Sequence, residues 1–300
     1  MIRVGTAGWS YGDWHGVVYP GTRPRGFHPL AYLARFVDCV EVNSTFYAQP
    51  NPVHAAQWVR LVEGRAGFRF TAKLLRDFTH EPWQGFDPVV TARAYAHGLA
   101  PLADAGRLAG ILVQFPFAFR CTTEAEERVA RIHDLLGRSL PGVRLVVELR
   151  HASWFHVESQ HARERLAARG FSIAHIDLPA GPEHAPREFP TSNRDLGYLR
   201  LHGRNRTSWF DPRAGRDQKY DYLYTVDETR EITERVRRLA TGKDETFVIT
   251  NNHFAGQALV NALEILAELR QAPPLAPAQL VERYPRLKGV VRTEGQGSLF

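Results

Sequence analysis

Eight short apolar segments recur along the chain, and nearly all of them end in polar, charged or aromatic residues. These candidate strands lie at 2–9, 39–47, 69–74, 110–116, 144–151, 172–178, 197–203 and 246–252. Stretches with helical character lie between them, at 28–36, 52–62, 88–104, 123–138, 158–169, 227–241 and 255–270. Strands that alternate with helices are typical of parallel βαβ units. Eight such strands in a chain of this length predict an α/β fold, a single (β/α)₈ barrel of the TIM type.

Two long loops and a tail complete the organisation. Residues 180–195 are too rich in proline, glycine and charge for a regular helix, and residues 204–224 form a basic and aromatic loop. Long loops at the catalytic face of a barrel commonly carry substrate contacts. A proline-rich segment follows Arg270. We therefore expect a barrel domain over 1–270 and a C-terminal tail over 271–300.

The ends of the strands predict where the site lies. In barrels of this type the active site is built at the C-terminal ends of the strands. The residues at these ends are Trp9, Asn43, Lys73, Gln114, Arg150, Asp177, His202 and Asn252.

Alternation along each strand predicts which side chains point into the barrel. The more apolar face of each strand is expected to pack on helices, and the other face to point inward. The polar residues that this places inside are Glu41, Asn43, Thr45, Arg69, Thr71, Lys73, Glu148, Arg150, His175, Asp177, Tyr198, Arg200, His202, Thr250 and Asn252. Buried charges are costly unless they are paired. The set therefore either neutralises itself, as we expect for Glu41 and Arg69, or binds a ligand.

Five of the inward residues are candidate catalytic groups: Lys73, Glu148, Arg150, Asp177 and His202. Three interpretations remain open. In the first, Glu148, Asp177 and His202 hold a divalent metal ion as a cofactor. In the second, Lys73, Arg150, Arg200 and His202 surround a phosphate or carboxylate, while Glu148 or Asp177 acts as a general base. In the third, the pocket binds a ligand without reacting.

Aromatic, amide and cationic side chains near the same ends are candidate substrate-binding groups. Trp9, Tyr47 and Trp154 are placed to stack on a sugar or a base. Asn251 and Asn252 offer amide contacts to hydroxyls or phosphate. The remaining candidates are Asn43, Arg200, Arg204 and Arg206.

Composition adds little to this picture. Lysine and arginine number 38 against 32 acidic residues, a net charge of +6, which weakly favours an anionic partner. Two cysteines support neither a disulfide framework nor a zinc site. The sequence offers no apolar stretch long enough to span a bilayer and no basic, apolar leader, so we expect a soluble cytoplasmic protein with no membrane partner.

Several motifs resemble the YecE-like family of TIM-barrel proteins of unknown function. They are GTAGWSYGDWHGVVYP at 5–20, VEVNSTFY at 40–47, FRFTAKLLRDFTH at 68–80, ILVQFP at 111–116, VVELRHASW at 146–154, YLRLHG at 198–203 and the asparagine pair in TNNHFAGQALVNA at 250–262. The last motif departs slightly from an aromatic-then-NN form. The resemblance covers almost the whole barrel and implies a TIM-type fold, but it brings no catalytic residues with it.

The chain ends in Gln-Gly-Ser-Leu-Phe, which resembles the pentapeptide that binds the bacterial DNA sliding clamp. Gln296, Ser298, Leu299 and Phe300 are the candidate partner-binding residues, because a Leu-Phe pair fits an apolar pocket while the glutamine hydrogen-bonds beside it. Proteins held at the clamp act on DNA, which makes nucleic acid a candidate partner.

These observations lead to one prediction with two alternatives. The prediction is an enzyme that acts on phosphate-containing substrates, with nucleic acid favoured, of a phosphodiesterase or nuclease type and recruited by the sliding clamp. One alternative is an enzyme of small sugars or sugar phosphates. The other is a non-catalytic adaptor that binds the clamp.

Overall fold

A parallel β-barrel forms the centre of the molecule in the computed structural model, which describes residues 1–190 and 196–294. One sheet contains the strands in the order β6-β5-β4-β3-β2-β1-β9-β8-β7, all parallel to their neighbours. The strands are β1 (Ile2–Ala7), β2 (Cys39–Val42), β3 (Arg69–Lys73), β4 (Leu108–Gln114), β5 (Leu145–Glu148), β6 (Phe171–Ile173), β7 (His175–Asp177), β8 (Leu196–Leu201) and β9 (Glu245–Thr250). The TIM-type α/β barrel expected from the sequence is confirmed.

The sixth predicted strand is split into two. Its first half, β6, pairs with β5, and its second half, β7, pairs with β8. Ala174 lies between them, and its backbone N–H donates to the Val147 carbonyl at 2.9 Å. The two edges of the sheet therefore meet within one short segment, which leaves the barrel nearly closed.

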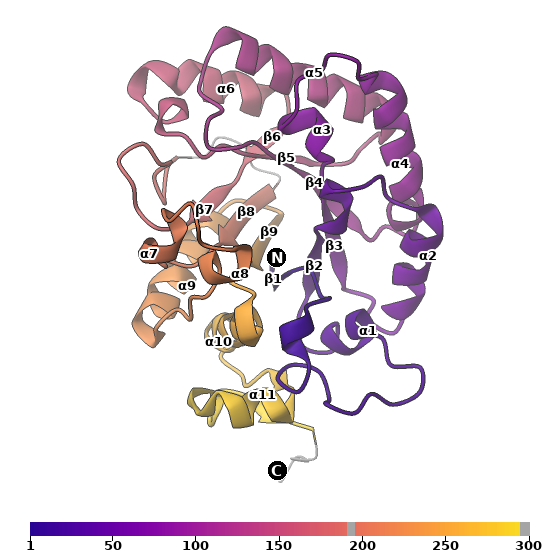
Figure 1. The fold of residues 1–300 in the computed structure, drawn as a ribbon, viewed down its shortest axis with the longest axis vertical. Helices are drawn as coiled ribbons and strands as arrows, with labels where there is room; N and C mark the ends of the chain where they lie inside the picture. The colour runs from indigo at the N-terminus through magenta and orange to yellow at the C-terminus, as the bar shows by residue number, and fades with distance from the viewer. Residues whose placement is uncertain (191–195, 295–300) are drawn as a thin grey trace.

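Helices surround the strands (Figure 1). They are α1 (Pro29–Leu33), α2 (Pro52–Leu61), α3 (Arg76–Thr79), α4 (Pro88–Asp104), α5 (Thr123–Ser139), α6 (Gln160–Ala168), α7 (Arg206–Trp209), α8 (Arg216–Lys219), α9 (Val226–Ala240), α10 (Gln257–Arg270) and α11 (Ala278–Arg283). Residues 178–190 carry no helix, in agreement with the composition of that loop.

Local sequence explains the long helices. The apolar face of α5 buries Val129, Ile132 and Leu136, and the Thr122 hydroxyl caps its first turn by accepting from the Ala125 N–H at 3.2 Å. At the start of α9, Thr225 and Glu228 form a reciprocal capping box. These signals fix where the helices begin, so that their apolar faces meet the outside of the barrel.

Two apolar layers result, one between strands and helices and a smaller one inside the barrel. The inner layer consists of Ala7, Cys39, Ala109, Leu112, Val146, Ala174, Leu196, Tyr198, Phe247 and Ile249. The expected facing of β9 was therefore wrong, because Phe247 and Ile249 point inward where Thr250 and Asn252 were expected. The other face carries Thr246, Val248 and Thr250, so this strand turns its more apolar face inward, against the rule that we applied to every strand.

The first part of the predicted tail packs against the barrel. Residues 271–294 include α11, the short strands β10 (Leu275–Ala276) and β11 (Arg292–Thr293), and the fully buried side chains of Leu280 and Leu287. The side-chain amide of Gln279 donates to the Val18 carbonyl at 2.6 Å. The domain boundary at residue 270 stays a prediction.

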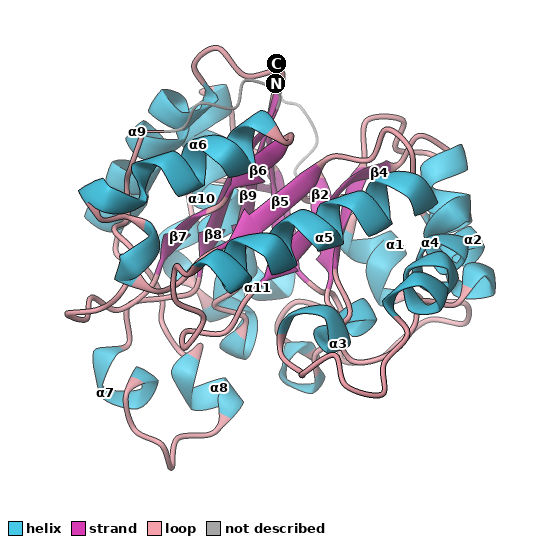
Figure 2. Cartoon of the chain, turned by 90° about the horizontal axis from the view of Figure 1, so that it is seen from above, coloured by secondary structure: helices cyan, strands magenta, loops and turns pink. Residues whose placement is uncertain are grey.

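Figure 2 shows α3, α7 and α8 at the end of the barrel opposite the N-terminus. This end is the C-terminal mouth of the parallel strands, and α7 and α8 come from the long basic loop. In the part of the chain that the structure describes, no helix is both long and apolar enough to cross a membrane.

Candidate functional site

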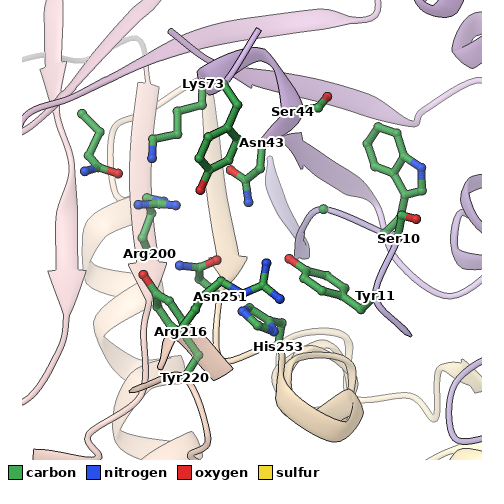
Figure 3. Close-up of a pocket in the computed structure, with 14 residues that line it drawn as sticks. Ser10, Tyr11, Asn43, Ser44, Lys73, Arg200, Arg216, Tyr220, Asn251 and His253 are labelled. Carbon is green, nitrogen blue, oxygen red and sulfur yellow. The ribbon is translucent and has the colours of Figure 1, made fainter. Parts of the chain in front are cut away.

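A pocket of about 340 Å³ opens at the C-terminal mouth of the barrel. Figure 3 shows its side chains converging from the ends of several strands and from α8. The lining residues are Gly8, Trp9, Ser10, Tyr11, Asn43, Ser44, Tyr47, Lys73, Gln114, Arg200, Arg216, Tyr220, Asn251 and His253.

The turn after β1 supplies one wall of the pocket. Gly8 has a φ of +81°, a conformation that side-chain-bearing residues rarely adopt, and a Cβ atom there would lie 3.0 Å from the Tyr11 hydroxyl. The turn places Trp9 edge-on against Trp58, with ring centroids 5.4 Å apart. Tyr11 stacks on His253 at 4.4 Å, and its hydroxyl donates to the Ala7 carbonyl.

An ion-pair network lies directly beneath the pocket. The Arg200 guanidinium donates to Glu41 through Nε at 3.0 Å and Nη2 at 2.7 Å, and to Glu148 through Nη1 at 2.6 Å. Arg150 Nε donates to the other oxygen of Glu148 at 2.6 Å. Glu41, Glu148 and Arg200 are at most 2% exposed. Although burial opposes ionisation, the two guanidiniums hold the pKa of Glu148 well below its usual range.

Lys73 stands next to this network without joining it. Its ammonium nitrogen lies 3.6 Å from the centroid of the Phe46 ring. Over residues 1–190 and 196–294, no carboxylate forms an ion pair with it. Burial, together with the charges of Arg200 and Arg150, lowers the pKa of Lys73 from 10.5 to about 7.

The opposite wall comes from the basic loop and from the end of β9. Arg216 and Tyr220 line the pocket from α8 and its C-terminal end, and His253 follows the asparagine pair. Burial is the main cause that lowers the pKa of His253 to about 4, so this ring is neutral at pH 7. Asn251 lines the mouth, and its amide contacts His202 Nδ1 at 3.0 Å. His202 is fully buried, and burial holds its pKa well below the usual range.

The charge balance of the lining is uneven. Lys73, Arg200 and Arg216 line the pocket, whereas no aspartate or glutamate from the part of the chain that the structure describes lines it. Four aromatic side chains also line it, those of Trp9, Tyr11, Tyr47 and Tyr220. The arrangement suits an anionic group joined to an organic body that offers an apolar or ring face.

The expectation that Asp177 and His175 point into the barrel was wrong. Asp177 accepts from Arg204 at 2.8 Å and from Arg235, on α9, at 2.6 Å, so it faces the helix layer. His175 stacks on Phe189 at 4.1 Å. The break at Ala174 disturbs the simple alternation, and the guanidiniums of the helix layer compensate the buried Asp177 carboxylate.

Three further sequence-predicted residues lie away from the pocket. Trp154 is fully buried and donates from Nε1 to the Phe119 carbonyl at 2.8 Å, so it is a core residue. Asn252 donates to the Tyr222 carbonyl at 2.8 Å. Arg204 is bound by Asp177, Glu228 and Glu231. None of the three lines the pocket.

The predictions for Arg206 and for the metal ligands also differ from the structure. Arg206 reaches the Ala180 carbonyl at 3.3 Å and does not line the pocket. In the described ranges, no group of three or more His, Cys, Asp or Glu side chains is arranged to hold a metal ion. Glu148 and His202 lie 3.9 Å apart, but Asp177 faces the helix layer with its oxygens held by arginines. The three predicted metal ligands are therefore not brought together.

Sequence reasoning did not select Tyr11, Arg216, Tyr220 or His253 for the site. Each lies in a segment that the sequence marked as unusual: the motif at 5–20, the loop at 204–224 or the stretch after the asparagine pair. The sequence pointed to these segments, but which of their residues enter the pocket depends on how each loop folds. The predicted clamp-binding residues, Gln296 to Phe300, lie outside the described residues.

The chain is similar to known proteins over most of its length. The family model described as "Protein of unknown function DUF72" matches residues 3–283. The UPF0759 protein YunF of Bacillus subtilis is 28% identical over 291 residues, which cover 93% of this chain and 99% of that protein. The UPF0759 protein YecE of Escherichia coli K12 is 30% identical over 199 residues, 65% of each chain.

Two solved structures have the same fold. A DUF72 family protein from Thermotoga maritima MSB8 has a TM-score of 0.75 and 34% identity, covering 90% of this chain and 99% of that one. A DUF72 family protein from Enterococcus faecalis V583 has a TM-score of 0.78 and 25% identity, covering 91% and 96%.

Proposed function

Because this chain belongs to the DUF72 family, whose function is unknown, we propose a function from its own site: an enzyme whose barrel mouth binds a small phosphate-bearing substrate. The observation that carries the proposal is the charge balance of the pocket. Lys73, Arg200 and Arg216 line it, and no carboxylate of the described residues does. Cations that converge in a partly dehydrated cleft favour an anion, and guanidinium matches the geometry of phosphate.

Arg216 is the main anion contact in this proposal. Arg200 already holds two carboxylates, so its charge is largely compensated. Within residues 1–190 and 196–294, the acidic partner of Arg216 is the exposed Asp217, at 2.8 Å, and such surface pairs exchange readily for another anion. The amides of Asn43 and Asn251 offer hydrogen bonds to the hydroxyls of the substrate.

The aromatic walls favour a small ligand over a DNA duplex. Trp9, Tyr11, Tyr47 and Tyr220 surround a cavity sized for one sugar or ring. Two arginines of the basic loop bond within the protein: Arg204 to three carboxylates and Arg206 to the Ala180 carbonyl at 3.3 Å. A nucleic-acid substrate is therefore the less favoured alternative, to be decided by the binding experiment.

The test is calorimetric titration with inorganic phosphate, pyrophosphate and a set of sugar phosphates. Arg216→Gln is expected to weaken phosphate binding about tenfold, because one charge-assisted contact is lost. Arg213→Gln is the matched control: it lies in the same loop, is 90% exposed and does not line the pocket. Equal affinity in the two variants, or tight binding of duplex DNA without competition by phosphate, would contradict the proposal.

Recruitment by the sliding clamp is a separate proposal that depends on the last five residues. Its support is the Gln-Gly-Ser-Leu-Phe sequence itself. Full-length protein is expected to bind purified sliding clamp, and a chain that ends at Glu294 is expected not to bind it. Equal binding of both forms would refute the motif.

A further inference from the structure

Resting on the function proposed above, we propose that Lys73 is a nucleophile, which forms an imine with the carbonyl carbon of a phosphate-bearing aldehyde or ketone. The inference adds a reaction to the binding site. It comes from the placement of one amine among cations, an aromatic ring and an unpaired amide oxygen.

The backbone at Lys73 is held in place. Its carbonyl accepts from the Thr45 hydroxyl at 2.7 Å and from the Tyr95 hydroxyl at 3.0 Å. These two bonds tie the end of β3 to the turn after β2 and to α4. The side chain therefore leaves a fixed point and enters the pocket, where Figure 3 shows it extending toward Arg200. A reactive group needs such positioning to meet its substrate in one geometry.

The surroundings of Lys73 favour the neutral amine. Arg200 and Arg150 are the nearby cations, and the carboxylates of Glu148 and Glu41 are already engaged by these arginines. The Phe46 ring beneath the nitrogen acts the other way, because a cation–π contact favours the ammonium, but it does not outweigh burial and the two arginines.

Burial is the main cause that lowers the pKa of His80, to about 4, and the pKa of His202. Both imidazole rings are therefore neutral at pH 7 and add no charge near Lys73. A lysine that is dehydrated and placed beside other cations is a recognised arrangement for amine nucleophiles. The pKa of about 7 leaves roughly half of Lys73 unprotonated at neutral pH.

An unpaired acceptor lines the same pocket as the amine. The Oδ1 atom of Asn43 is buried and has no hydrogen-bond partner in the described part of the chain. Figure 3 places this side chain between Lys73 and Tyr11. A buried acceptor without a partner is costly. The hydroxyl of a carbinolamine formed on Lys73 would satisfy it, because that hydroxyl is a donor.

The step balances without a further reactant. The amine lone pair forms a bond to the carbonyl carbon, and the carbonyl oxygen takes up a proton to become the carbinolamine hydroxyl. The nitrogen gives up one proton, the hydroxyl takes up one proton, and the oxygen leaves as water. The sum is amine plus carbonyl plus one proton, giving a protonated imine plus water. The cost of that positive charge is offset by the phosphate of the same substrate.

The experiment uses pyridoxal 5′-phosphate as the probe, since it combines an aldehyde, a ring and a phosphate. The full-length protein is treated with the probe, reduced with borohydride to fix any imine as a secondary amine, and mapped by peptide mass spectrometry. The chain has only four lysines, at 73, 219, 243 and 288. At pH 7 we expect Lys73 to be labelled at least about tenfold faster than the others, because its neutral fraction is far larger. Half-maximal labelling of Lys73 should fall near pH 7.

Two variants identify the labelled lysine, and two ligand controls separate this inference from the phosphate site. Lys73→Gln should lose the fast label, and Lys288→Gln, which changes an exposed lysine, should keep it. Mapping of the unmodified protein gives the same answer if Lys73→Gln fails to fold. Pyridoxal, which lacks the phosphate, should label Lys73 more slowly, and inorganic phosphate should compete only with the phosphorylated probe.

The outcomes distinguish the two proposals. Preferential labelling of Lys73 by both probes at equal rates, without phosphate competition, would support the nucleophile and refute the phosphate site. Phosphate binding with no preferential label on Lys73 would overturn the nucleophile and leave the phosphate site standing.

Discussion

At the scale of single residues, Arg200 organises the interior of the barrel. It is 2% exposed and bonds to both Glu41 and Glu148, and Tyr198 donates to Glu41 at 2.9 Å. Two buried carboxylates thus share this guanidinium, and Glu148 has Arg150 as a second partner. When one partner of such a network is removed, unpaired charges remain buried. The resulting loss of stability is larger than the net stability that the intact network contributes.

Arg200→Met is therefore expected to lower the free energy of unfolding by about 3–5 kcal/mol at pH 7. The folded-state pKa of Glu148 is depressed in the unmodified protein, so the stability from this pair is present above the unfolded pKa of about 4.5 and is lost as the pH falls through the folded-state value. The difference in unfolding free energy between the variant and the unmodified protein should therefore become smaller at acid pH. Urea unfolding from pH 7 down to about pH 2.5 measures it, because the loss lies below the unfolded pKa, with the exposed Arg213→Met as the control that should change little.

Lys73 has the opposite effect on stability. Its pKa is about 7 in the folded protein and 10.5 in the reference state. Between these values the unfolded chain binds a proton that the folded protein does not, so stability rises with pH. Below pH 7 Lys73 is protonated in both states, so the full free-energy cost of burying its positive charge lowers the stability. Lys73→Met should thus stabilise the protein at pH 7 by about 1–3 kcal/mol.

That gain should fade as the pH approaches 10.5, which unfolding curves at pH 6, 8 and 10 would reveal. Lys288→Met is the exposed control and should leave the curves unchanged at every pH. Replacement of a reactive group often increases stability while activity is lost. A destabilised Lys73→Met variant at pH 7 would mean that the amine is paired in solution.

At the scale of elements, two helical glycines show how closely the outer layer packs. A Cβ atom on Gly98, in α4, would lie 2.1 Å from the Pro50 carbonyl oxygen, so α4 rests directly on the backbone that precedes α2. Gly137, in α5, has open space around its Cβ position. The same residue type thus serves close packing in one helix and has no packing role in the other.

The two glycines predict opposite effects of one substitution. Gly98→Ala should destabilise the protein by about 1–3 kcal/mol, because α4 must move away. Gly137→Ala should stabilise it by about 0.5–1 kcal/mol through helix propensity. Thermal unfolding of both variants measures the difference, and a loss of similar size in both would contradict the close contact of α4 with Pro50.

At the scale of the whole molecule, the chain beyond α10 extends the hydrophobic core. Ala276, Leu280 and Leu287 are fully buried in the same cluster as the barrel helices. Tyr284 donates to the Ala255 carbonyl at 2.7 Å, and Arg286 pairs with Glu264 at 2.7 Å. The segment therefore supports the turn before α10, which follows the pocket residue His253.

A chain that ends at Arg270 should consequently unfold at a markedly lower temperature, since each buried leucine is worth about 2 kcal/mol. A chain that ends at Glu294 retains all of these contacts and should unfold like the full-length protein. Calorimetry of the two truncated forms measures this directly. Equal stability of the shorter form would show that residues 271–294 add nothing to the core.

The sequence by itself determined the barrel and most of one side of its mouth. Apolar segments at regular spacing marked the strands, and on β2, β3, β5 and β8 a clearly polar face fixed which residues point inward. Glu41, Glu148 and Arg200 were found this way, because two faces of contrasting polarity leave one orientation that buries apolar surface.

The tertiary structure decided the rest. The break at Ala174 interrupts the alternation of the sixth predicted strand, and β9 turns its more apolar face inward, so Asp177 and Asn252 were placed on the wrong side. Arg216 and Tyr220 reach the pocket only because their loop folds over the mouth. Loop positions and charge partners depend on contacts between residues far apart in the sequence, and a local pattern of hydrophobicity does not contain them.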